Sequence, residues 1–182
     1  MVCLGLWLAG CVGHTPVKTA GPEKTAAVPV AVAVANTEAA QQVDKLEAWL
    51  RSKLPAGIEL QRQDQNLWLR VAVGDAFVSD ASALSATGDA LLDLVAEGLS
   101  QSPRQGLQIR VFTDALGSRP ANEQFAAARA ESVRTYLRGR SIAARRMLVL
   151  AGGPDCMPGT DETPEGRQLK RRLELLITPL FS

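Results

Sequence analysis

The chain has 182 residues, with 20 Lys and Arg against 19 Asp and Glu and a formal net charge of +1. This length suits one domain with short additional segments, and the balanced charge excludes the basic excess that nucleic-acid binding requires. Hydrophobic residues make up 46% of the chain, enough for a packed core, whereas aromatic residues make up only 4%, too few for base-stacking platforms. One histidine and three cysteines exclude most zinc sites and histidine-based catalytic sites. We therefore expect no enzymatic activity, no cofactor and no nucleic-acid partner.

The N-terminal segment, residues 1–10, is apolar and uncharged. It is shorter than the roughly 20 residues that a membrane-spanning helix needs, and its small residues at the end are typical of a secretory signal. The sequence Leu8-Ala9-Gly10-Cys11 resembles the lipobox of bacterial lipoproteins. The resemblance implies that residues 1–10 are a signal peptide and that Cys11 carries the lipid, including palmitate. Val12, rather than Asp, after this cysteine implies an outer-membrane lipoprotein that faces the periplasm.

Residues 11–42 are rich in Ala, Val, Thr and Pro, with few charges and no lasting hydrophobic period. This composition predicts a flexible tether between the lipid and a folded domain. His14 lies in the tether, so the only histidine of the chain is outside the expected domain. Cys156 therefore has no histidine within the domain to activate its thiol, and we expect it to be structural or incidental, with an intermolecular disulfide as the alternative.

Residues 43–182 show the periodicity of one folded domain. An amphipathic helical repeat begins at Val43 and ends before Pro55. Alternating apolar residues between Ile58 and Val73, interrupted by a polar stretch, predict a β-hairpin. After the hairpin we expect, in chain order, a helix over 84–99, a strand over 107–111, a helix over 120–139, a strand over 147–151, a loop over 152–166 and a strand over 173–177. Strands joined by helices of this length predict an α/β sandwich with the helices on one face of the sheet.

Four motifs in this domain follow one another in the order and at the spacing of a known family. They are the Phe-containing segment Ala76–Leu84, the strand Ile109–Asp114 that ends in Thr-Asp, the helix segment Asn122–Ala130, and Gly166-Arg167 followed by Lys170-Arg171-Arg172-Leu173-Glu174. Together they resemble the OmpA-like C-terminal module, which binds peptidoglycan. The resemblance implies a mixed sheet with helices on one face and a site for the diaminopimelate of peptidoglycan stem peptides. Phe125 stands where the family usually has Leu, and Lys170 where it usually has Asn.

Asp114 and Arg129 form the centre of the site that this resemblance implies. Asp114 lies where a strand gives way to a loop, and Asn122, Phe125 and Arg129 share one helix face because they are three and four residues apart. A carboxylate beside a guanidinium suits a ligand that carries both an ammonium and a carboxylate, as diaminopimelate does. The residues expected to bind diaminopimelate are Asp114, Arg129, Thr113, Asn122, Phe125, Phe77, Arg171 and Arg172.

Some interpretations stay open at this level. In isolation, Asp114 and Arg129 also fit a structural ion pair that joins a strand to a helix. Arg171 and Arg172 are neighbours in a predicted strand and should point to opposite faces, so one is expected to face the ligand and the other the solvent. The leading functional prediction is a lipoprotein that binds peptidoglycan without catalysis and tethers the outer membrane to the cell wall. The alternative is an envelope or secretion-complex assembly lipoprotein that contacts protein partners, with weak or lost peptidoglycan binding.

Overall fold

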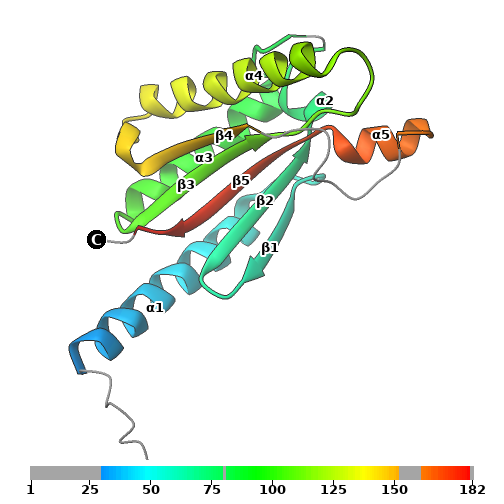
Figure 1. Ribbon diagram of the computed structural model, residues 1–182. Helices are drawn as coiled ribbons and strands as arrows, with labels where there is room; N and C mark the ends of the chain where they lie inside the picture. The colour runs from blue at the N-terminus through cyan, green and yellow to red at the C-terminus, as the bar shows by residue number, and fades with distance from the viewer. Residues whose placement is uncertain (1–29, 80, 152–160, 181–182) are drawn as a thin grey trace, which may run out of the picture.

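The computed structural model describes residues 30–79, 81–151 and 161–180, and its centre is a five-stranded sheet with the strand order β1-β2-β5-β3-β4. The strands are β1 (Glu59–Gln63), β2 (Asn66–Ala72), β3 (Gln105–Val111), β4 (Met147–Ala151) and β5 (Arg172–Pro179). The helices are α1 (Val30–Lys53), α2 (Val73–Ala76), α3 (Ala86–Gln101), α4 (Arg119–Gly139) and α5 (Pro164–Lys170), with a short 3-10 helix at Ala144–Arg146. Figure 1 shows how these elements are arranged.

The sheet is mixed, as the family resemblance implied. β1, β2, β5 and β3 pair antiparallel in turn, and β4 is parallel to β3. The last strand of the chain, β5, therefore lies in the centre of the sheet, between β2 and β3 (Figure 1). The end of β3 and the beginning of β5 consequently lie side by side, with Val111 opposite Leu173.

The core lies between one face of this sheet and the helices α1, α3 and α4. Alternate strand residues point to the same face, and the buried set includes Leu67, Leu69 and Val71 of β2, Leu107, Ile109 and Val111 of β3, and Leu173, Leu175 and Ile177 of β5. The helices contribute Leu46 and Leu50 from α1, Leu91, Val95 and Leu99 from α3, and Val133 and Leu137 from α4. The prediction of an α/β sandwich with helices on one face is confirmed.

The helix α1 begins much earlier than the sequence predicted. It extends from Val30 to Lys53, so the prediction of a flexible tether is wrong for residues 30–42. This stretch is rich in alanine, the strongest helix former, which outweighs its lack of a clear hydrophobic period. Arg104, which follows α3, pairs with Glu38 of α1 at 3.4 Å, so part of this extension contacts the rest of the molecule. The domain boundary at residue 43 stays a prediction.

Two further elements differ from the sequence-based expectation. The hairpin turn is confined to two residues between β1 and β2, and Asp64 there has a φ of 55°. The helix α5 lies partly within the expected loop 152–166, of which residues 152–160, with Cys156, are outside the described residues. None of the described helices has a stretch that is both long and apolar enough to cross a membrane.

Candidate functional site

Asp114 lies at the end of the sheet, just after β3, and is held by two donors. Asp114 is buried, with 7% of its surface exposed. Its Oδ1 accepts a hydrogen bond from the Leu116 backbone N–H at 3.2 Å, and its Oδ2 accepts one from Arg171 Nη1 at 2.5 Å. Among the described residues, the Asp114 carboxylate therefore pairs with Arg171, which lies between α5 and β5.

Asn122 shapes the loop that follows Asp114. Its Nδ2 donates to the backbone carbonyl of Asp114 at 3.2 Å and to that of Leu116 at 2.7 Å. Gly117 has a φ of 87°, a conformation that favours glycine, and the Ser118 hydroxyl caps α4 by accepting from the Ala121 N–H. Asn122 thereby fixes the loop between the strand that carries Asp114 and the helix that carries Arg129.

Arg129 lies between two aromatic rings. Its guanidinium carbon is 4.0 Å from the centre of the Phe125 ring and 5.3 Å from that of Phe77. The Nε donates to the Ala81 backbone carbonyl at 2.9 Å, and the residue is buried. Guanidinium groups are attracted to the faces of aromatic rings, so these rings hold the charged group in one orientation. Phe125, which stands in place of the family's usual Leu, adds the closer of the two contacts.

These side chains surround one cavity of about 390 Å³. Its lining combines residues from the end of β3, the first turns of α4, the helix α2 and the junction of α5 with β5; they are Val73, Gly74, Phe77, Val78, Ser79, Thr113, Asp114, Asn122, Phe125, Arg129 and Arg171. All of the residues predicted from the sequence except Arg172 are in this set. Within the described part of the chain, the buried hydroxyl of Thr113 has no hydrogen-bond partner.

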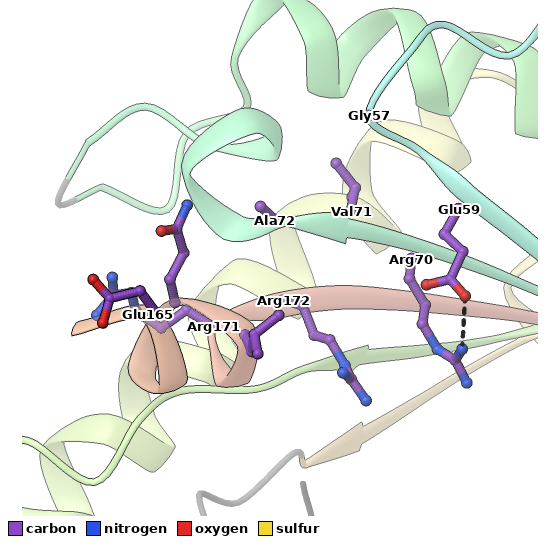
Figure 2. A pocket seen from close by; sticks show the side chains of 10 residues that line it. Gly57, Glu59, Arg70, Val71, Ala72, Glu165, Arg171 and Arg172 are labelled. Carbon is purple, nitrogen blue, oxygen red and sulfur yellow. Dashed lines mark hydrogen bonds and ion pairs between the residues drawn. The ribbon is translucent and has the colours of Figure 1, made fainter. Parts of the chain in front are cut away.

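Arg172 is not among the residues that line this cavity, so its expected part in ligand binding stays a prediction. It begins β5, and its Nη2 is 2.9 Å from Glu174 Oε1 on the same strand. Figure 2 shows its side chain running in the same direction as that of Arg70 on the neighbouring strand β2. Both arginines line a second cavity of about 420 Å³, to which Arg171 also contributes. Arg171 and Arg172 diverge because neighbouring residues of an extended chain point to opposite sides.

Several residues of the site were not expected from the sequence. The four-residue helix α2 supplies Val73 and Gly74 to the cavity wall, and such a short helix has no periodic signal of its own. The Ala81 carbonyl, which binds Arg129, belongs to a loop and carries no sequence signal either. Asp161 was also missed, although it accepts the backbone N–H of Ala115 at 2.9 Å, directly beside Asp114.

Comparisons with known proteins identify the family of the part of the chain that carries this cavity. The model of the OmpA family matches residues 76–172, a span that contains the whole lining of the first cavity except Val73 and Gly74. The chain belongs to the OmpA family.

Individual relatives and structures resemble different shares of the chain. The probable lipoprotein YiaD of Escherichia coli is 29% identical over 139 residues, which cover 76% of this chain and 64% of that protein. The peptidoglycan-binding protein ArfA of Mycobacterium tuberculosis is 31% identical over 102 residues, which cover 56% of this chain and 31% of that protein. The crystal structure of a putative MotB-like protein from Desulfovibrio vulgaris has a TM-score of 0.68 at 19% identity, covering 79% of this chain and 96% of that one, and shows the shared fold.

Proposed function

We propose that this protein binds peptidoglycan non-covalently, through the diaminopimelate of its stem peptides. The observation that carries this proposal is the cavity in which the Asp114 carboxylate and the Arg129 guanidinium come together from two different elements. Membership of the OmpA family, and the likeness to a relative named for binding peptidoglycan, support the same ligand. The role needs no bond to be made or broken, so we propose a binding protein and not an enzyme.

The free end of diaminopimelate in a stem peptide carries an ammonium and a carboxylate on one carbon. Asp114 would accept from the ammonium, because a carboxylate has about four acceptor positions and its two donors among the described residues, Leu116 and Arg171, leave some of them unused. Arg129 would donate to the ligand carboxylate, for which a guanidinium offers paired N–H groups. The Thr113 hydroxyl would add a third contact. Asn122, Phe125 and Phe77 would hold these groups in place.

Sedimentation with purified peptidoglycan tests this proposal. We expect Asp114→Asn and Arg129→Gln each to reduce the amount that sediments at least tenfold, because each substitution removes one charge-assisted contact worth about 1.5–3 kcal/mol. Asp64→Asn is the matched control, since it removes the same charge from the exposed hairpin turn. Free diaminopimelate should compete with the wall for the wild-type protein.

Unchanged sedimentation of both variants, with their folds intact, would show that the cavity is not the binding site. No sedimentation of the wild-type protein would contradict wall binding altogether. That second result, together with recovery of the protein in an envelope complex, would favour the alternative role as an assembly lipoprotein.

We also propose that Cys11 anchors the protein to the outer membrane, with the folded part in the periplasm, so that membrane and wall are joined. The lipobox-like Leu8-Ala9-Gly10-Cys11 supports this placement, as does the likeness to a probable lipoprotein. These residues lie outside the described ones.

Cys11→Ser should abolish incorporation of a labelled palmitate and release the protein from the membrane fraction. A Cys3→Ser control should keep the label, and a Cys11→Ser protein that stays labelled would contradict the anchor.

A further inference from the structure

We infer that Asp161, which does not line the cavity, is a positioning residue that holds Asp114 and Arg171 in their binding geometry. The inference rests on the proposed function, since it assigns a role in that same site. It follows from the contacts that one carboxylate makes with two separate parts of the chain.

Both oxygens of the Asp161 carboxylate are engaged. Oδ1 accepts the backbone N–H of Ala115 at 2.9 Å, and Oδ2 accepts from the Lys170 ammonium. The backbone carbonyl of Asp161 also accepts from Arg167 Nη1 at 2.7 Å. One residue therefore connects the loop after β3 to two positions on α5. Asp161 and Ala115 are 46 residues apart in the sequence.

Lys170 makes this connection a strong one. Its side chain is only 9% exposed, and a buried ammonium needs a charged partner. Asp161 is the partner that the structure gives it, and the Lys170 ammonium, followed by the Ala115 N–H, lowers the pKa of the Asp161 carboxyl. At neutral pH the carboxylate is therefore ionised and bound to both groups.

The two contacts of Asp161 lie immediately beside the two members of the Asp114–Arg171 pair. Ala115 directly follows Asp114, and Lys170 directly precedes Arg171. The contacts Ala115–Asp161–Lys170, called the Asp161 bridge below, therefore connect the same two segments of the chain as the Asp114–Arg171 ion pair at the cavity. Arg171 has a side chain that is 43% exposed and is long and flexible, so a fixed backbone on both sides determines where its guanidinium meets Asp114.

The sheet itself does not depend on this bridge. β3 and β5 are paired without interruption from Gln105 opposite Pro179 to Val111 opposite Leu173, and α5 and the Asp114 loop lie beyond that pairing. Loss of the bridge should therefore loosen the end of the sheet that carries the site and leave the core intact.

Asp161→Asn tests the inference, because the amide loses the negative charge and replaces one of the two acceptor oxygens, which bind Ala115 and Lys170 separately, with an NH2 donor. We expect affinity for a soluble diaminopimelate-containing muropeptide to fall roughly fivefold to tenfold, as for loss of one hydrogen-bonded charged contact. Amide hydrogen exchange should accelerate at Ala115 and Leu116 but not in β3 or β5. Asp161→Glu, which keeps both acceptors, should restore most of the affinity, and Asp64→Asn should change nothing.

The outcomes separate the inference from the proposed function. Wild-type protein that fails to bind the muropeptide overturns both. Wild-type binding with equal affinity in Asp161→Asn overturns the positioning role alone, as does Asp161→Glu binding no better than Asp161→Asn. If Asp161→Asn does not fold, Lys170→Met breaks the same bridge from α5 without leaving a buried charge. Wild-type affinity in Lys170→Met would then overturn the inference.

Discussion

At the scale of single residues, Thr113 is a polar residue whose burial is incompletely satisfied. It is buried and lines the cavity, and its hydroxyl has no hydrogen-bond partner within the described residues. A buried hydroxyl without a hydrogen bond costs about 1–3 kcal/mol. A ligand bound in the proposed site would offset this cost if it made a hydrogen bond to the hydroxyl.

Thr113→Val should therefore separate stability from binding. Valine has nearly the same shape but no hydroxyl, so we expect the free energy of unfolding to stay the same or to rise by up to about 1 kcal/mol. Affinity for a muropeptide should fall about threefold to tenfold, as for one lost hydrogen bond. Urea unfolding and calorimetric titration measure the two quantities. Thr135→Val, on the exposed side of α4, is the control, and an unchanged affinity in Thr113→Val would remove Thr113 from the site.

At the scale of single residues, the sequence predicted which residues line the cavity better than it predicted the contacts that they make. Asp114 and Arg129 followed from motifs in register, and both line the cavity. The same motifs did not show which arginine binds Asp114, because that depends on how the chain leaves α5 and enters β5. The sequence did not predict a role for Asp161 for a similar reason. One of its partners, Ala115, is distant in the sequence, and a single aspartate in a polar loop belongs to no motif that would indicate its contacts.

At the scale of elements, the site depends on how closely α3 approaches α2. The Ser85 hydroxyl caps α3 by accepting the Gly88 N–H at 3.0 Å. A Cβ on Gly88 would lie 2.1 Å from the backbone oxygen of Ala76, the last residue of α2. Glycine is therefore required here by the packing of two helices. Phe77, which contacts Arg129, follows α2 directly.

Gly88→Ala should disturb this junction. The clash is with backbone and not with a flexible side chain, so we expect a loss of about 1–3 kcal/mol in the free energy of unfolding, typical of overpacking, together with weaker ligand binding. Gly139→Ala is the control, because nothing lies within 4 Å of a Cβ at that helical position. That substitution should be neutral or should stabilise by up to about 1 kcal/mol. Equal stability of Gly88→Ala and wild type in urea unfolding would contradict the close approach.

Long elements with a clear period were predictable, and short or compositionally biased ones were not. α3, α4 and the strands of the sheet lie close to their predicted positions. α2 and α5 have four and seven residues, too few for a helical repeat to appear. The extension of α1 to Val30 escaped prediction because helix propensity, and not amphipathic pattern, produces it.

At the scale of the whole molecule, the cavity and the point where the chain enters the fold are far apart. The cavity lies where β3 ends and β5 begins, near α2 and α5, whereas α1 begins at the opposite side of the molecule (Figure 1). A helix of 24 residues is about 36 Å long. A membrane anchor upstream of α1 and a wall ligand in the cavity would then act at different ends of the protein, as a link between two layers requires.

The most direct test of the account is a nuclear magnetic resonance titration of the isotopically labelled protein with a soluble muropeptide that contains diaminopimelate. The account predicts saturable shifts at Thr113 to Leu116, at Phe125 and Arg129, and at Arg171. These shifts should disappear in Asp114→Asn. Shifts confined to the second cavity, around Arg70 and Arg172, or no shifts at all, would contradict the assignment of the first cavity as the peptidoglycan site.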